Sequence, residues 1–253
     1  MSPLPLTAFF FATPTEAHWL KTQLHLRSHI LFFPNCFYLG HRKSHPDQPL
    51  LIVETGVGLK AASQAAGLAF SHFQVREALL LGVAAAARPE LRRGEAILAL
   101  EVGGVEALEK RWRPDGGLLE RARRVLARDG GTFQEGPILS LDRIVHSPDE
   151  KIQIGHETGA MALEMEGASL AQEAEARGVS FLEIRWILDP TNSPLPLLDD
   201  WVDQRGTPRS AALTRAIFKR PKLLWELPAL GLQMSRALRP MKGFLQKWFA
   251  ESP

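Results

Sequence analysis

The sequence predicts a three-layer α/β/α domain with a central mixed, mostly parallel β-sheet, followed by a basic helical C-terminal extension. Three observations lead to this fold class. Short apolar segments alternate with helix-forming ones, as strands and helices do in such domains. The segment Ala78–Ala87 (ALLLGVAAAA) is apolar throughout, which is typical of a strand buried on both faces of a parallel sheet. The chain has 253 residues, of which 45% are hydrophobic, enough for one large core.

The N-terminal part is expected to be rich in strands. Thr7–Ala12 is a compact apolar segment with several phenylalanines, and Ile30–Leu39 and Leu50–Glu54 are further strand candidates. The turn-rich stretch His41–Pro49 separates the last two, as in a hairpin. A glycine turn, Thr55–Gly58, then leads into a helix-forming segment.

From residue 78 onward, strands and helices are expected to alternate. The expected strands are Ala78–Ala87, Ala96–Val102, Pro137–Asp142 and Phe181–Leu188, and the segment Ala162–Glu166 is expected to run directly into a helix. Helices are expected at Gly117–Asp129, after Ser147 and after Glu166. Ser147 is a suitable N-cap, and Pro148 suits the first turn that follows it.

The extension differs in character from the rest of the chain. We place the α/β domain at residues 1–192, and a Pro-rich loop with basic helices at residues 193–253. Ten Lys or Arg residues but a single acid, Glu226, lie between Arg205 and Lys247. Prolines are expected to break this region into short helices, and they stand at Pro208, Pro221, Pro228 and Pro240.

The basic residues of the extension alternate with large apolar side chains, a mixture typical of helices that lie at a membrane surface. The apolar ones are Trp225, Leu232, Leu238, Phe244, Trp248 and Phe249. The alternative is a tail that folds onto the domain or onto a second subunit, with its basic face in water.

Composition excludes several classes of protein. The net charge of +2 argues against a nucleic-acid partner for the whole molecule. The single cysteine, Cys36, forms no internal disulfide and no zinc cluster, and it fits a reducing cytosol. The N-terminus lacks a basic region before its short apolar run, so we interpret it as a strand and not as a signal peptide. We expect a cytoplasmic protein, with peripheral contact at the inner face of the membrane as an option for the tail.

Three acids stand where apolar elements end: Glu16, Glu166 and Asp189. Ligands of open α/β sheets bind beyond the carboxyl ends of the strands, so the three carboxyl groups are expected to meet at one site. Each acid alone would be read as a helix cap or a solvated loop residue. Only their combination indicates a catalytic site.

The stretch Ala162–Pro190 resembles the signature region of nucleoside phosphorylases and methylthioadenosine/adenosylhomocysteine nucleosidases. In that family an E-M-E segment begins a helix, and a strand with an internal Arg ends in an Asp. The matching residues are Glu164, Met165, Glu166, Arg185 and Asp189. Earlier matches are FFFATPTE with Glu16, the turn TGVG, LGVAAAA from Leu81, and SLDRIV at Ser140–Val145. The resemblance runs from Leu6 to Pro190.

The resemblance implies cleavage of the bond between a purine, adenine above all, and a ribose. Asp189 would donate the proton that releases the purine, Glu166 would contact the ribose hydroxyls and offset cationic charge, and Glu16 would hold or activate the attacking water. No metal or other cofactor is needed. Substrate contacts are implied for Met165, Gly56, Gly58, Val83, Arg143, Ile144 and Val145. For Arg185, which lies within a strand, we expect a structural ion pair.

The sequence departs from the family pattern in ways that bear on the attacking group. Val83 and a run of alanines replace the Ser or Thr that is frequent in the second glycine turn, and Leu188 replaces the usual Ser before the catalytic Asp. The candidate phosphate ligands are Arg42, Lys43 and Arg88, each of which is also a plausible solvated surface residue. These residues favour hydrolysis, with phosphate as the alternative co-substrate.

The tail from Asp203 to Pro240 resembles the C-terminal extension of the hopanoid-associated phosphorylase branch, which implies adenosylhopane, a lipid nucleoside, as substrate. Two alternatives stay open. A futalosine-type hydrolase shares the A-T-x-x-E start, and a non-catalytic nucleoside-binding or membrane-surface module would explain Val83 and Leu188. A homo-oligomer is expected in either enzyme reading.

Overall fold

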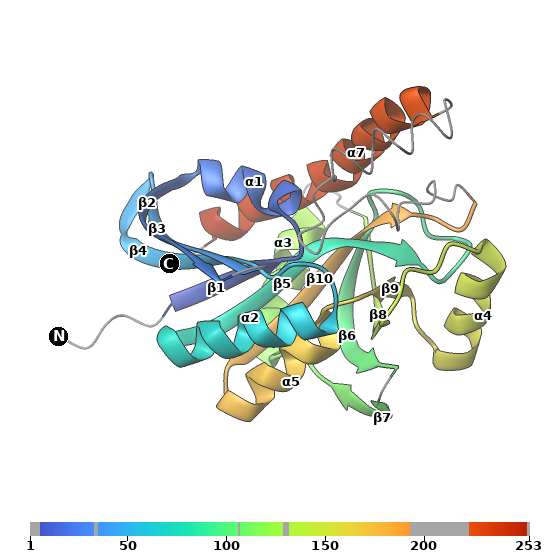
Figure 1. Ribbon diagram of the computed structural model, residues 1–253, viewed down its shortest axis with the longest axis horizontal. Coiled ribbons are helices and arrows are strands. Elements are labelled where there is room, and N and C mark those ends of the chain that lie inside the picture. Colours follow the sequence, from blue (N-terminus) through green and yellow to red (C-terminus); the bar gives the residue numbers. More distant parts are fainter. Residues whose placement is uncertain (1–5, 33–34, 106, 129–131, 193–222, 252–253) are drawn as a thin grey trace.

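The computed structural model describes residues 6–32, 35–105, 107–128, 132–192 and 223–251. Within them, one mixed β-sheet runs through the molecule with helices on both of its faces (Figure 1). The strands are β1 (Leu6–Phe11), β2 (Leu24–Phe32), β3 (Asn35–Arg42), β4 (His45–Glu54), β5 (Val75–Ala86), β6 (Ala96–Gly104), β7 (Ala107–Trp112), β8 (Phe133–Ser140), β9 (Ala162–Glu164) and β10 (Ser180–Asp189). The expected mixed α/β fold is therefore confirmed.

Five of the strands form a closed circuit. The strand order is β10-β6-β8-β9-β5-β1-β4-β3-β2, and β10 also pairs with β5, which joins the first strand of the path to its middle. β10 is parallel to β5 and antiparallel to β6. β8 is parallel to β6 and β9, and the short β9 returns antiparallel to β5. The sequence patterns did not predict this closure.

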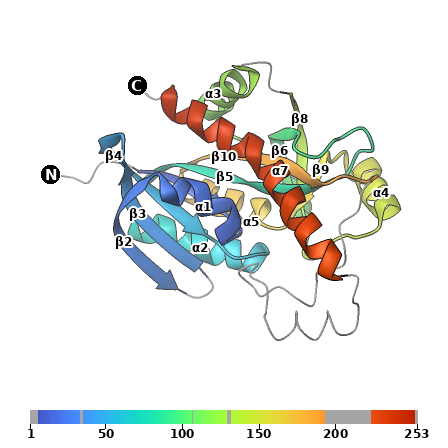
Figure 2. The same cartoon turned by 90° about the horizontal axis from the view of Figure 1, so that it is seen from above.

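Two helical layers cover the sheet (Figures 1 and 2). α2 (Leu59–His72) and α5 (Gly167–Arg177) pack on one face through small alanines, which allow the two helices to approach the strands closely. α1 (Pro14–Thr22), α3 (Gly116–Ala127) and α7 (Leu223–Ala250) cover the other face. α4 (Pro148–Thr158) lies beside the end of β5. The buried strands β1 and β5 supply side chains to both layers.

The N-terminal hairpins differ from the expectation. The predicted strand Ile30–Leu39 is divided between β2 and β3, which pair antiparallel with Phe32 opposite Asn35. The predicted loop His41–Pro49 contains the end of β3 and the start of β4. The reason is that β4 begins with exposed polar residues, so this part of the strand has no apolar alternation for a pattern to detect.

The C-terminal helix also differs. α7 continues through Pro228 and Pro240, so the breaks expected at these two prolines are wrong, whereas Pro208 and Pro221 lie outside the described residues. Burial explains how a helix survives an internal proline, which removes one hydrogen bond and distorts the preceding turn. The side chains that α7 buries against α1, α3 and β10 are Ala237, Met241, Phe244, Leu245 and Trp248.

This packing corrects the expected surface role of two aromatic residues. Phe244 and Trp248 are 3% and 1% exposed, and the ring of Phe244 lies 5.7 Å from that of Trp186 on β10. They belong to the core of the α/β domain and cannot insert into a membrane. The division of the chain at residue 192 stays a prediction, although α7 shares its core with α1 and α3. No helix in the described part of the chain is long and apolar enough to cross a membrane.

Candidate active site

One cavity of about 210 Å³ lies where β1, β5 and β10 end. These strands are parallel, so their carboxyl ends meet at one edge of the sheet. The predicted site residues that line the cavity are Glu16, Val83, Arg143, Ile144, Val145, Met165, Glu166 and Asp189. The structure therefore brings the three acids together. Gly56 and Gly58 are not in the wall, but Val57 between them is.

Glu16 is held by the start of α1. Thr13 is the N-cap, Pro14 follows at the first turn, and the carboxyl group of Glu16 closes a capping box by accepting the Thr13 N–H at 2.9 Å. The same carboxyl group also accepts the Thr13 hydroxyl and the N–H of Val83, each at 2.9 Å. Burial raises the pKa of Glu16, although Arg185 and these hydrogen bonds oppose the rise. A carboxyl group with a raised pKa holds its proton more tightly, which suits a role in proton transfer.

Glu166 stands at the N-terminus of α5 and reaches the first glycine turn. Its Oε1 accepts the N–H of Gly58 at 2.9 Å, and its Oε2 accepts a bond from Arg185 at 3.2 Å. Burial raises the pKa of Glu166 to about 7; Arg185 opposes the rise and the neighbouring Glu164 adds to it. Gly58 has a φ of 101°, which favours glycine, so its presence in the turn allows the main chain to hold Glu166.

A cluster of buried charged side chains around Arg185 lies next to these acids. Arg185 is fully buried, its Nε donates to Glu183 at 2.7 Å, and its Nη2 pairs with Glu164. Glu164 also accepts the N–H groups of Glu166 and Gly167 at 2.8 and 2.9 Å, so it caps α5. The ion pair expected for Arg185 is confirmed. With one arginine among several buried glutamates, burial and the charge of Glu164 raise the pKa of Glu183 to about 8.

Asp189 ends β10 and is mostly buried, with 7% of the residue exposed. Its Oδ2 accepts a hydrogen bond from Nζ of Lys151, a fully buried lysine on α4. The predicted site did not include Lys151. The two residues that α4 buries are Lys151 and Gly155, one helical turn apart on one face. The inward face of an amphipathic helix usually carries an apolar stripe, whereas α4 places a lysine and a glycine there. This departure is the sequence signal that could have identified Lys151.

The chain matches the family model of the phosphorylase superfamily over residues 7–219. This chain belongs to the phosphorylase superfamily. The match covers most of the chain and extends past the domain boundary predicted at residue 192.

Known proteins resemble this superfamily member along much of its length. A DeoD-type purine nucleoside phosphorylase of Streptococcus pyogenes serotype M4 is 28% identical over 178 residues, which cover 67% of this chain and 71% of the relative. A 5′-methylthioadenosine/S-adenosylhomocysteine nucleosidase of Maridesulfovibrio salexigens is 29% identical over 150 residues, covering 53% and 65%. The expected enzyme class, which cleaves N-glycosyl bonds, is thereby confirmed.

Two solved structures share the fold of this chain. The 5′-methylthioadenosine/S-adenosylhomocysteine nucleosidase of Neisseria meningitidis, in complex with methylthio-immucillin-A, has a TM-score of 0.74 and 19% identity, covering 98% of this chain and 100% of that one. The futalosine hydrolase of Helicobacter pylori has a TM-score of 0.74 and 18% identity, covering 98% of both chains.

Two of the predicted phosphate ligands of this superfamily member lie elsewhere. Arg42 contacts the ring of Phe249 and hydrogen-bonds Gln48, and Lys43 donates to the carbonyl of Thr22 at 2.8 Å. The β3–β4 turn that carries them is at the opposite end of β4 from the glycine turn, so closeness in sequence was misleading. Arg88 is not among the lining residues of the cavity.

Proposed function

We propose that this superfamily member hydrolyses the N-glycosidic bond of an adenine nucleoside. The observation that carries the proposal is the meeting of Glu16, Glu166 and Asp189, all mostly buried, in the wall of one cavity. An acid for the leaving base, a negative charge for the ribosyl cation and a base for water are what this reaction requires.

The proposed reaction divides these tasks among the three acids. Asp189 gives its proton to a ring nitrogen of the purine, and the electron pair of the breaking C–N bond leaves with the base. Glu166 offsets the positive charge that develops on the ribose and accepts bonds from its hydroxyl groups. Water adds to the anomeric carbon and loses a proton to Glu16, so the products are free base and free ribose sugar. Met165 and the loop residues Arg143–Val145 provide the walls for sugar and base.

Water is preferred over phosphate because of the charge of the cavity. Among the described residues that line it, Arg143 is the one cation, and its guanidinium pairs with Glu150 at 2.5 Å. A phosphate dianion needs charge-assisted donors and would face the carboxyl groups of Glu16 and Glu166. The relatives include both phosphorylases and nucleosidases, so the family alone does not choose between the two attacking groups.

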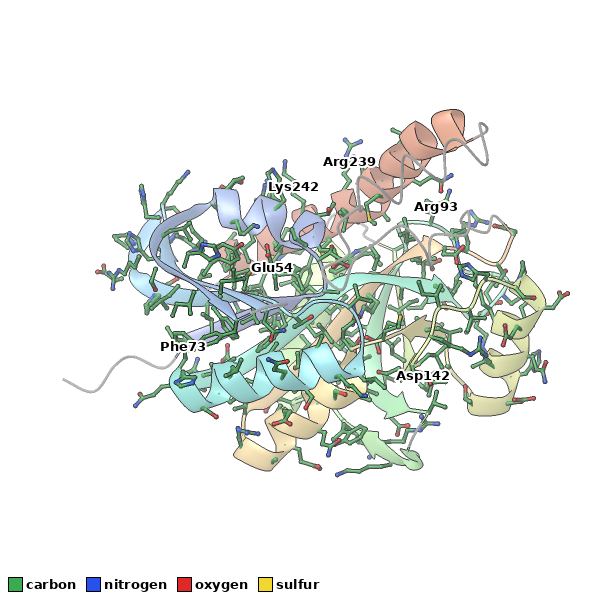
Figure 3. All side chains as sticks on the ribbon, viewed as in Figure 1. Glu54, Phe73, Arg93, Asp142, Arg239 and Lys242 are labelled. Atoms are coloured by element: carbon green, nitrogen blue, oxygen red, sulfur yellow. The ribbon has the colours of Figure 1, made fainter. Side chains whose placement is uncertain are left out.

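We further propose a nucleoside with a lipophilic 5′ group, such as adenosylhopane. Two observations favour it. The cavity wall is apolar at Val57, Val83 and Leu188, where a polar substituent would lose its hydration. In addition, basic side chains including Arg239 and Lys242 project from α7 on the side away from the sheet (Figure 3). Such a surface would suit peripheral contact with an anionic membrane. The homo-oligomer stays a prediction.

The test is release of free base in phosphate-free buffer, measured by chromatography with adenosine, 5′-methylthioadenosine, futalosine and adenosylhopane. Release of adenine without ribose 1-phosphate is expected, with adenosylhopane having the largest kcat/KM. A strict requirement for phosphate would reverse the choice of attacking group. A preference for futalosine would favour the futalosine-hydrolase alternative. Binding of nucleosides without any base release would make the protein a binding module.

A further inference from the structure

The ion pair between Lys151 and Asp189 is not used by the reaction proposed above. Lys151 is 0% exposed, and its Nζ donates to Oδ2 of Asp189. Lysine is almost never fully buried unless it is paired, because its ammonium group loses its hydration. Asp189 lines the cavity, whereas Lys151 is not among the lining residues. The lysine therefore reaches the cavity only through the aspartate.

α4 holds Lys151 firmly at this place. Ser147 caps the helix by accepting the N–H of Glu150 at 3.4 Å. Gly155, on the same face as Lys151, approaches the residue that directly follows β5 so closely that a Cβ there would lie 2.2 Å from the carbonyl oxygen of Ala87. β5 is the parallel neighbour of β10, which carries Asp189. The helix that supplies the cation is thus anchored to the strand beside the aspartate.

We propose that Lys151 is a positioning residue for the leaving-group acid, an inference that rests on the proposed function. Its ammonium group fixes the orientation of the Asp189 carboxyl group through Oδ2. Asp189, a carboxylate in its pair with Lys151, first takes a proton from solvent; its O–H bond then breaks, an N–H bond forms on the purine, and the carboxylate is restored. Lys151 keeps its protons throughout and stabilises that carboxylate. A cation beside the newly formed anion lowers the barrier to base release.

Three other charged side chains near this pair have partners of their own. Glu16 and Glu166 face the same cavity and are held by the N–H groups of Val83 and Gly58. Arg93, on the segment before β6, donates to the carbonyl of Leu188 at 2.8 Å, next to Asp189. Glu16 and Glu166 are acids, so neither can supply the positive charge that Lys151 brings to Asp189. Arg93 donates to the main chain of the neighbouring residue, Leu188.

The first test compares two leaving groups in the variant Lys151→Met. A purine must be protonated to leave, whereas 4-nitrophenolate leaves without a proton. We expect kcat/KM for the purine nucleoside to fall about tenfold to a hundredfold, within the range of general acid catalysis, and kcat/KM for 4-nitrophenyl riboside to change little. Equal losses for both substrates, or no loss for the purine nucleoside, would overturn the proposal.

The second test needs no turnover. The ligand in a Helicobacter pylori nucleosidase structure, a 4-amino-5H-pyrrolo[3,2-d]pyrimidine, has a pyrrole N–H where adenine has an unprotonated ring nitrogen, and a carboxylate would accept it. We expect Lys151→Met to weaken its Kd about tenfold or more, since hydrogen bonds to charged groups are the strong ones. Lys21→Met is the matched control, because Lys21 pairs with the buried Glu54 away from the cavity wall. An unchanged Kd in Lys151→Met would contradict the proposal.

A double variant keeps the proposal testable if Lys151→Met folds poorly with an unpaired buried carboxylate. Lys151→Met combined with Asp189→Asn removes both charges. If the lysine acts through the aspartate, adding Lys151→Met to Asp189→Asn costs no further purine cleavage, and additive losses would exclude this mechanism. Wild-type protein that neither cleaves nor binds nucleosides would overturn the proposed function together with this inference. Normal wild-type cleavage with an unaffected lysine variant would overturn the inference alone.

Discussion

The carboxyl group of Glu16, on α1, accepts a hydrogen bond of 2.9 Å from the main-chain N–H of Val83, on β5. The donor is the backbone, so the identity of the side chain at position 83 is not what holds Glu16. This explains how valine can stand where related enzymes often have a hydroxyl-bearing residue. The residue at position 82 must instead be small, because the main chain there comes close to the carboxyl group of Glu16.

Gly82→Ala should therefore damage the reaction more than the fold. A Cβ at this position would lie 2.6 Å from Oε1 of Glu16 and 2.7 Å from Nη1 of Arg185, so both side-chain ends must move. We expect kcat to fall about tenfold or more, because misplacing one reacting group by an ångström can cost up to about a hundredfold. Steady-state kinetics and thermal unfolding measure the two effects.

Gly103→Ala is the matched control, since the three atoms nearest to its Cβ would all belong to the side chain of Arg111, which does not line the cavity. A Gly82→Ala variant with wild-type kcat would show that Glu16 is not required where the structure holds it.

Asp189→Asn should slow base release from purine nucleosides by about 10²–10⁴-fold and leave a measurable residual rate. The amide cannot act as the acid for the departing base, and general acid catalysis contributes about 10²–10⁴-fold in rate. The amide oxygen can still accept the bond from Lys151, so the fold should survive, as circular dichroism would show. Unchanged turnover would remove Asp189 from the mechanism.

Glu183→Gln should stabilise the protein in alkaline solution. Burial raises the pKa of Glu183 from 4.5 to about 8, so between these pH values the folded state keeps a proton that the unfolded state has lost. The stability that this group contributes is complete below pH 4.5 and is lost as the pH rises toward 8. Glutamine does not titrate, and its oxygen can still accept from Arg185.

We expect the free energy of unfolding at pH 8.5 to rise by at least about 1 kcal/mol in Glu183→Gln, since one pKa unit corresponds to about 1.4 kcal/mol. Near pH 4.5 the variant and the wild type should be equally stable. Urea titrations at both pH values measure this. Glu157→Gln, at an exposed site on α4, should show no such pH dependence, and an equal gain in both variants would contradict the assignment.

Anionic vesicles should bind the protein in a salt-sensitive way through α7. Arg236 and Arg239 are exposed on this helix, and each basic residue near an anionic bilayer is worth about 1 kcal/mol. The double change to glutamine should weaken binding about tenfold or more, and 0.5 M salt should screen it. Sedimentation with phosphatidylserine vesicles measures the binding. The same change at the exposed Arg76 and Arg113 is the control of equal charge; equal losses would mean that α7 is not the contact.

Removing the chain after Gly206 is a poor test of this contact. The deletion would also remove Met241, Phe244 and Trp248, which pack into the core. Loss of binding in such a truncated protein would report unfolding as readily as loss of a membrane surface.

Sequence patterns were sufficient for the parts of the fold and the site that depend on local order. Glu16, Glu166 and Asp189 were recognised because each follows an apolar element, and parallel strands bring such positions to one edge. The capping of α4 by Ser147 was likewise visible in the sequence, and the structure confirms it. The catalytic roles of the three acids remain predictions.

What the patterns missed depends on contacts between distant residues. Lys151 is itself a buried residue on the inward face of α4, so an apolar pattern cannot mark it, and its partner lies 38 residues away. The hydrogen bond from Val83 comes from the main chain and carries no side-chain signal. Pro240 argued for a break in α7, but the burial of Met241 and Phe244 outweighs the local preference. The closure of the strands through β10 is also a property of tertiary pairing alone.

Synthesis from the N-terminus delivers β10 last among the five strands of the closed circuit. Until it has left the ribosome, β5 and β6 expose edges that β10 will later cover, and the wall that contains Asp189 does not exist. Uncovered strand edges are templates for aggregation, so the nascent chain is expected to need a chaperone until β10 has emerged. A prematurely terminated chain would be an aggregation hazard and never a weak enzyme.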